Sequence, residues 1–339
     1  MKIALWALIL LASTAAAQAP PAPSTLAHVR ASGILHCGVI EDDAEYSNED
    51  DHASRDDFDD NLCKGMAVAA LGPNAKVDIL RFLDEESAVA GLKSGRLDVI
   101  ATLSANAAHT SDTNLRLSIP VFYDGTALLT RGSLHIDSVR ALSGKKICFL
   151  AETATELALQ QWFAAHHLDL LPFPFQEEGE MEAAYVTGNC AAIASDRTRL
   201  SLLRASLGTL ASQHVLLPTL LSLHPLAMAT RNDDPAWSTL TNAFISVLLE
   251  AEDLGVSSHD LGSSQAASQP AVQNLLQSAR ATGESLGLRT RWATDVVQSI
   301  GNYAQVYDST FGAALPRALD RSVNRLRDRG GLLAPGSLP

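Results

Sequence analysis

Residues 145–175, KKICFLAETATELALQQWFAAHHLDLLPFPF, decide the fold class of this chain. The apolar run at 145–150 predicts a buried strand, and the apolar residues of 155–167 recur at the spacing of a helix. A second short apolar run follows at 171–175. Strands that alternate with helices in this way are typical of α/β proteins with mainly parallel sheets. We therefore predict an α/β fold.

The same alternation extends along the chain in both directions, in two series of similar order. Two series predict two lobes: residues 25–130 begin the first, 131–223 form the second, and 224–339 return to the first with C-terminal helices. The other predicted strands lie at 34–40, 77–83, 97–103, 122–130, 190–195 and 226–230. The other predicted helices lie at 58–71, 85–93, 181–187, 197–207, 235–254, 292–307 and 316–327.

The N-terminus has the parts of a secretory signal peptide. A short positive start precedes the apolar residues 3–12 and the small residues 15–17, so we predict that residues 1–17 are cleaved off. Residues 18–24, QAPPAPS, then form a flexible leader. The apolar stretch is shorter than the about 20 residues of a membrane span. We expect a periplasmic protein without a membrane span, and no cysteine near the cleavage site to carry a lipid.

The four cysteines are an even number in a chain predicted to be exported, where disulfides form and persist. Four cysteines allow three pairings. Consecutive pairing closes modest loops, each giving roughly 3 to 4 kcal/mol in the loop-entropy model. We predict the pairs Cys37 with Cys63 and Cys148 with Cys190. A zinc site is the minor alternative, because no closely spaced ligand pair is present.

Composition narrows the class of protein. A chain of 339 residues that is 47% hydrophobic and 19% charged can build a globular core in two domains. A net charge of -13 argues against nucleic acid and against anionic membrane surfaces as partners.

The loops after the predicted strands are the expected ligand site, because open α/β sheets bind small molecules beyond the carboxyl ends of their strands. Thr153 and Thr155 stand where a helix begins, so free backbone N–H groups there could hold an anion. Simple capping of the helix is the more common role of such residues. The candidate ligand-binding residues are Thr102, Ser104, Ser111, Tyr123, Thr153 and Asp196.

The chain resembles a known family, the solute-binding components of bacterial polar amino-acid ABC transporters, especially the general L-amino-acid-binding type. The resemblance implies a type II periplasmic-binding-protein fold, in which two α/β lobes joined by two hinge strands close on an amino acid or related small polar solute. It also implies delivery to an ABC permease in the inner membrane, and we expect a monomer. The matching stretches include TLAHVRASGILHCGV, DFDDNLCKGMAVAALG, VFYDGTALLTRGSL, ICFLAETATELAL, ASDRTRL and HVLLPTLLSLHPLAMATR.

Three positions bear on the ligand that the resemblance implies. The family arginine that holds the ligand α-carboxylate falls at or beside Ser111, where this chain has no arginine. Truncating one partner of such a contact costs about 2 to 5 kcal/mol of binding free energy. The glycine of the family's Gly-Thr helix start is replaced by Glu152, which also disfavours a carboxylate. Asp196 matches the acidic residue that grips the α-ammonium group, and a helix N-cap before Arg197 is its alternative role.

The acidic segment 41–60, EDDAEYSNEDDHASRDDFDD, replaces the apolar wall of the family. A solvated loop is the favoured interpretation, since runs of like charge usually are that. A site for a cationic ligand, such as a polyamine, a basic peptide or a divalent cation, is the alternative. A non-transport interaction or sensory partner is a further alternative.

No motif of an enzyme stands out in the sequence. It contains no G-x-S-x-G elbow, no HExxH and no P-loop. His36 and His224 lie in apolar predicted strands, where packed core histidines are expected. We therefore predict no catalytic residue, no cofactor and no metal ligand.

Overall fold

The computed structural model of the chain describes residues 24–41, 58–260, 268–336 and 338. The predicted signal peptide, nearly all of the leader and most of the acidic segment lie outside the described residues.

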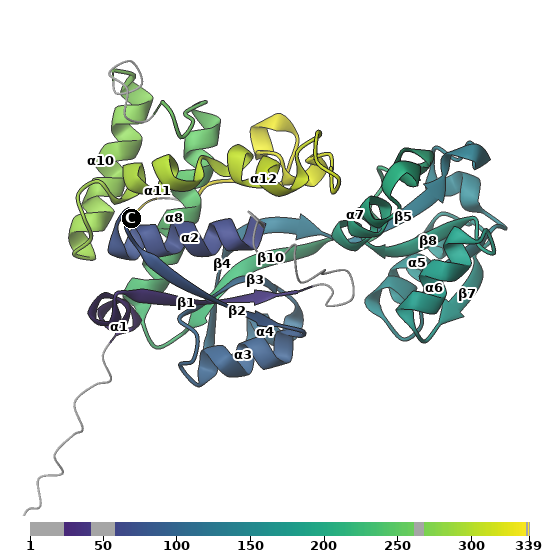
Figure 1. Cartoon of the computed structure of the whole chain (residues 1–339), viewed down its shortest axis with the longest axis horizontal. Helices are drawn as coiled ribbons and strands as arrows, with labels where there is room; N and C mark the ends of the chain where they lie inside the picture. Colours follow the sequence, from purple (N-terminus) through teal and green to yellow (C-terminus); the bar gives the residue numbers. More distant parts are fainter. Residues whose placement is uncertain (1–23, 42–57, 261–267, 337, 339) are drawn as a thin grey trace, which may run out of the picture.

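Two separate five-stranded sheets organise the molecule, and each forms one lobe with its helices (Figure 1). Sheet A has the strand order β2-β1-β3-β10-β4, in which β1 pairs in parallel with β2 and β3, and β10 runs antiparallel to both of its neighbours. Its strands are β1 (Ile34–Ile40), β2 (Lys76–Phe82), β3 (Val99–Ser104), β4 (Leu115–Asp124) and β10 (His224–Arg231).

Sheet B has the order β7-β6-β8-β5-β9, with β6 parallel to β7 and β8, and β5 antiparallel to β8 and β9. Its strands are β5 (Thr126–Arg131), β6 (Lys146–Leu150), β7 (Leu171–Phe175), β8 (Ala192–Asp196) and β9 (His214–Leu216). The α/β class that the alternation in the sequence predicts is confirmed. The sheets are mixed, however, because each has two parallel and two antiparallel pairings, so the expectation of mainly parallel sheets is wrong.

Helices cover both sheets. Those of the sheet A lobe are α1 (Thr25–Ser32), α2 (Phe58–Leu71), α3 (Glu85–Lys93), α4 (Ala107–Ser111), α8 (Pro235–Asp253), α10 (Pro270–Ser285), α11 (Trp292–Ile300) and α12 (Tyr303–Phe311). Those of the sheet B lobe are α5 (Ala154–Ala165), α6 (Glu178–Val186) and α7 (Arg197–Ser206). Within the described residues, no helix combines the length and the apolar character that crossing a bilayer requires.

The largest core lies in the sheet A lobe, around α8. Asp234 caps this helix by accepting hydrogen bonds from the N–H groups of Ala236 and Trp237, and Pro235 begins it. The predicted apolar face of the helix is confirmed as buried. It consists of Trp237, Leu240, Phe244, Val247, Leu248 and Ala251.

Each lobe contains one disulfide. Cys37 of β1 is bonded to Cys63 of α2, and Cys148 of β6 is bonded to Cys190, which precedes β8. In both pairs the Cα atoms are 5.8 Å apart. The predicted pairings are confirmed.

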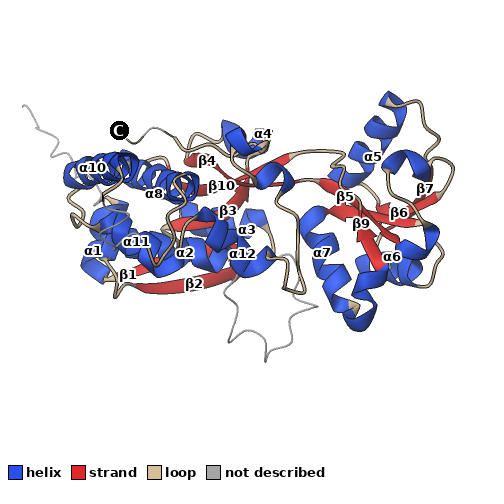
Figure 2. Ribbon diagram, turned by 90° about the horizontal axis from the view of Figure 1, so that it is seen from above, coloured by secondary structure: helices blue, strands red, loops and turns tan. Residues whose placement is uncertain are grey.

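The chain crosses between the lobes twice, and Figure 2 shows loops at the junction between the sheet A lobe and the sheet B lobe. The first crossing is at Gly125, which separates β4 from β5, and the second lies between β9 and β10. The single strand predicted at 122–130 is therefore wrong, and the chain leaves sheet A earlier than residue 130.

The C-terminal part also differs from the sequence prediction. The helix predicted at 292–307 is interrupted at Gly301, whose φ of +88° belongs to the left-handed region, and Asn302 then caps α12. The helix predicted at 316–327 is absent, and short 3₁₀ turns stand there instead. The reason is tertiary: the fully buried Asn324 side chain bonds both the N–H and the C=O of Tyr123, at 2.7 and 2.9 Å.

Candidate ligand-binding site

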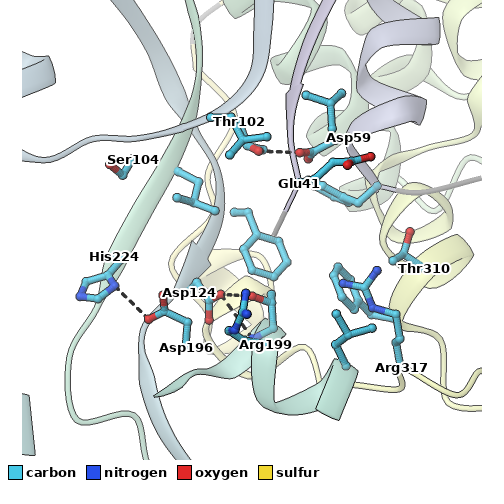
Figure 3. Close-up of a pocket in the computed structure, with 18 of the residues that line it drawn as sticks. Glu41, Asp59, Thr102, Ser104, Asp124, Asp196, Arg199, His224, Thr310 and Arg317 are labelled. Atoms are coloured by element: carbon cyan, nitrogen blue, oxygen red, sulfur yellow. Dashed lines mark hydrogen bonds and ion pairs between the residues drawn. The ribbon is translucent and has the colours of Figure 1, made fainter. Parts of the chain in front are cut away.

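A cavity of about 900 Å³ lies between the two lobes and next to both crossings. Its walls come from sheet A, from the starts of α2 and α3, from the segment 309–317, and from β8, α5 and α7 of the other lobe. Its volume is within the range of small-molecule sites. Figure 3 shows the polar side chains that face this space.

One wall in the sheet A lobe is a network of charged groups around Arg81. The Nη2 atom of Arg81 lies 3.1 and 3.0 Å from the two carboxylate oxygens of Asp60, and Nε lies 3.3 Å from Oε1 of Glu41. Beside this network, Thr102 donates a hydrogen bond of 2.7 Å from Oγ1 to Oδ2 of Asp59. The guanidinium of Arg81 is thus already engaged by carboxylates of the protein itself.

A second wall is fixed by Glu85 at the start of α3. Its carboxylate accepts hydrogen bonds from the N–H of Ser104 at 2.9 Å and from the hydroxyl of Ser104 at 2.8 Å. The side-chain amide of Asn106 donates to the same hydroxyl at 2.8 Å, and its Oδ1 caps α4 by accepting from the N–H of His109. The loop after β3 is therefore held in place by side chains, and Ser104 lies on the cavity.

The sheet B lobe contributes Asp196, at the end of β8. Its side chain is half exposed, and it stands at the N-cap position of α7 but makes no capping hydrogen bond. Asp124, the last residue of β4, caps the helix instead. Its carboxylate accepts from the N–H of Arg197 at 3.0 Å, from the N–H of Thr198 at 3.3 Å and from the Thr198 hydroxyl. Asp196 therefore stays directed at the cavity.

His224 is the titratable group that the structure places beside Asp196. Its Nδ1 atom is 3.5 Å from Oδ1 of Asp196, and its Nε2 is 3.1 Å from the hydroxyl of Ser222. The hydrogen bond to Asp196 raises the pKa of His224 above its ordinary value, burial opposes this, and the charges of Asp196 and Asp124 add to the rise. The prediction that His224 is a packed core histidine is wrong, because it lines the cavity.

The start of α5 offers less to an anion than its sequence indicates. Glu152 has a φ of +61°, and its N–H donates to the side chain of Glu156 at 2.8 Å. The hydroxyl of Thr153 donates to the carbonyl of Leu150 and does not cap the helix. A carboxylate of the protein thus occupies one of the N–H groups that a ligand would need.

Aromatic rings and two arginines complete the cavity. The rings of Phe58, Phe122 and Phe311 form a cluster with centroid distances of 5.4, 6.4 and 5.6 Å. The guanidinium of Arg317 lies 5.6 Å from the centroid of the Phe311 ring, and that of Arg199 is ion-paired with Glu178. The cavity wall formed by the segment 309–317 therefore combines apolar and charged side chains.

Of the six candidate residues, Thr102, Ser104 and Asp196 line the cavity. The other three do not. Ser111 is exposed at the end of α4, Thr153 is exposed, and the backbone of Tyr123 is bonded to Asn324.

Several lining residues were missed from the sequence. His224 had a usable signal, because it comes just before the strand predicted at 226–230. Asp124 lies inside the strand predicted at 122–130, where its charge was the signal. Arg81 lies inside a predicted strand and had none. Other missed charged residues of the cavity are Glu41, Asp59, Glu85, Arg199 and Arg317.

No family model matches the chain. The general L-amino acid-binding periplasmic protein AapJ of Rhizobium johnstonii is 31% identical over 338 residues, which cover 98% of this chain and 96% of AapJ. The glutamate/glutamine/aspartate/asparagine-binding protein BztA of Rhodobacter capsulatus is 29% identical, with 91% of this chain and 92% of BztA covered. A periplasmic binding protein from Brucella ovis, solved with glutathione bound, is similar with a TM-score of 0.76 and 27% identity, over 94% of this chain and 100% of that one.

Proposed function

The chain belongs to the family of amino-acid-binding periplasmic proteins of ABC transporters, and we propose that it binds an amino acid or a related small polar solute in the cavity between its lobes. We further propose that it is itself periplasmic after cleavage of residues 1–17, acts as a monomer and hands its ligand to an ABC permease. The relatives are binding proteins, so we propose no catalysis. They do not favour the cation-binding or sensory alternatives.

The observation that carries this proposal is the position of Asp196. Its carboxylate is half exposed, lines the cavity, and is released from helix capping by Asp124. A carboxylate in such a place attracts a cationic group, and the ammonium of an amino acid is one. We therefore assign Asp196 as the group that binds the ligand α-ammonium.

The α-carboxylate of a ligand lacks the family's usual partner. Ser111, at or beside which the family resemblance places that arginine, is exposed and donates its hydroxyl to the carbonyl of Ala108. Arg81 and Arg199 reach the cavity but are bonded to carboxylates of the protein. We infer that affinity for a free amino acid rests more on the ammonium end than it does in proteins with that arginine.

The ligands named for the relatives have an end group in common. AapJ and BztA are named for amino acids, and glutathione, bound in the Brucella ovis protein, is a tripeptide whose γ-glutamyl end carries a free ammonium and carboxylate. We propose that the ligand of this chain has an α-ammonium group, whatever the rest of the molecule is.

The test is a calorimetric and thermal-shift screen of the mature protein against the common L-amino acids and glutathione. At least one of them should raise the melting temperature and bind without turnover. The variant D196N should weaken that binding by about tenfold or more, since removing a charged partner costs about 2 kcal/mol upward and about 1.4 kcal/mol corresponds to tenfold.

Asp137→Asn is the matched control, because Asp137 is an exposed carboxylate of the same lobe outside the cavity. Its affinity should equal that of the unmodified protein. A screen in which no compound binds would contradict the proposed function. Equal binding by D196N would remove Asp196 from the site.

A further inference from the structure

His224 and Asp196 face each other across the two lobes inside the cavity, and they form an ion pair when the imidazole is protonated. His224 begins β10 of sheet A, and Asp196 ends β8 of sheet B. Figure 3 shows the imidazole directed at the Asp196 carboxylate, over the 3.5 Å that separates Nδ1 from Oδ1. Ser222 holds the other ring nitrogen at 3.1 Å. The imidazole is therefore oriented toward the carboxylate that we assign to the ligand.

The groups around His224 leave Asp196 as its main counter-charge. Asp124 faces it from β4, but both carboxylate oxygens of Asp124 already accept hydrogen bonds from the start of α7. Arg199 of α7 lines the same cavity and is ion-paired with Glu178. The raised pKa of His224, caused first by Asp196, agrees with this geometry.

We propose that His224 is the resident counter-ion of Asp196 and that the ammonium group of a ligand takes its place. This inference rests on the proposed function and adds a residue to it. With His224 protonated, the ammonium displaces the imidazolium from Asp196, and the imidazole then loses its proton to the solvent. No covalent bond forms or breaks. At pH values between the pKa of His224 in the ligand-bound protein and its higher pKa in the free protein, capture of the ligand is thus coupled to release of a proton.

The coupling sets the direction of the pH dependence. Below the pKa of His224 a ligand competes with an imidazolium for Asp196, and above it the imidazole is neutral and competes only as an uncharged hydrogen-bond donor. Affinity should therefore rise with pH through this range. The limit for one displaced proton is about tenfold per pH unit.

The experiment is isothermal titration calorimetry of the full mature protein at about pH 5.5 and about pH 8, the range in which histidine titrates. L-Glutamine, L-asparagine and L-alanine are the probes, because their side chains do not titrate there. Two buffers of different ionisation enthalpy count the protons released. We expect binding at least about fivefold tighter at the higher pH and net proton release at the lower pH.

Two variants distinguish the pair from general effects of pH. H224Q keeps a hydrogen-bonding side chain that cannot be protonated, so its affinity should be the same at both pH values. H36Q removes a histidine from another His–Asp pair, in which Nδ1 of His36 is 3.2 Å from Asp78, outside the cavity. H36Q should retain the pH dependence of the unmodified protein.

The possible results distinguish failure of this inference from failure of the proposed function. Absence of binding by every amino acid at both pH values would overturn the proposed function, and this inference with it. Binding whose pH dependence is unchanged in H224Q would overturn this inference alone. A proton NMR titration without ligand adds an independent measurement: the pKa of His224 should fall in D196N, and an unchanged pKa would also overturn the pairing.

Discussion

Glu152 occupies a backbone position that suits glycine. Its φ of +61° places it in the left-handed region, between the end of β6 and the start of α5. For a residue with a Cβ atom this conformation costs about 1 to 2 kcal/mol. In this conformation the N–H of Glu152 donates to the side chain of Glu156, in the first turn of α5, at 2.8 Å. The family resemblance, in which glycine stands here, agrees with this backbone.

Replacing Glu152 by glycine should stabilise the protein. We expect E152G to raise the free energy of unfolding by about 0.5 to 1 kcal/mol, because relief of the left-handed strain exceeds the entropy that glycine adds to the unfolded chain. Urea denaturation without ligand measures this. E152A is the control, since alanine removes the charge and keeps the strain. Equal stabilisation by E152A would assign the effect to charge.

Helix α7 depends on a cap from the other sheet. Asp196 stands at its N-cap position without capping it, whereas Asp124 at the end of β4 accepts from Arg197 and Thr198. Asp124 is buried, at 6% exposure, so these charge-assisted bonds are shielded from water. One carboxylate therefore joins the first crossing segment to a helix of the second lobe.

Removal of the Asp124 carboxylate should lower the free energy of unfolding far more than removal of the Asp196 carboxylate. D124A should lower the free energy of unfolding by about 2 to 3 kcal/mol, because it takes the carboxylate acceptor away from the N–H of Gly125 and from the N–H and hydroxyl of Thr198. D124N should cost less, since its amide oxygen can still accept. D196A should cost less than about 1 kcal/mol, the worth of an exposed ion pair. If D196A lowered the free energy of unfolding as much as D124A, Asp196 and not Asp124 would be the cap of α7.

Elements with strong local patterns were predictable from sequence, and those decided by distant contacts were not. The apolar face of α8 and the βαβ order around α5 follow from periodicity alone. The helix predicted at 316–327 does not form, because the side chain of Asn324 is hydrogen-bonded to the backbone of Tyr123, far away in the sequence. Besides Asp124 and Gly125, the strand predicted at 122–130 contains only apolar residues and two threonines, which strands favour, so its break at the lobe crossing had only a weak signal.

The residues of the cavity also divide into those that local sequence patterns predict and those that distant contacts decide. Thr102, Ser104 and Asp196 could be predicted because they lie at the carboxyl ends of strands. The partner of Asp196 could not, because His224 comes from a strand of the other sheet. Ser111 was placed by family resemblance, and the structure shows it exposed and outside the cavity lining. Contacts between lobes are set by topology, which local patterns do not encode.

At the scale of the whole molecule, the two crossing segments are hydrogen-bonded to each other. The N–H of Thr126 donates to the Ser222 hydroxyl at 2.9 Å, and the N–H of Leu221 donates to the Thr126 carbonyl at 2.8 Å. The Gly125 carbonyl accepts from the N–H of Arg197 at 3.0 Å. Lobes that close about a hinge bend at a few such residues, so Gly125 and its neighbours are the expected pivot.

A methyl group at Gly125 should disturb this pivot. A Cβ atom there would lie 2.1 Å from the carbonyl oxygen of Ser222, so the crossing segments must move apart. We expect G125A to lower the free energy of unfolding by about 1 to 3 kcal/mol and to weaken amino-acid binding in calorimetry. G179A is the control: it lies in α6 with no atom within 4 Å of its Cβ, and should stabilise by about 0.5 to 1 kcal/mol without changing affinity. If G125A matched the unmodified protein in both measurements, the crossing segments would separate freely and the pivot would lie elsewhere.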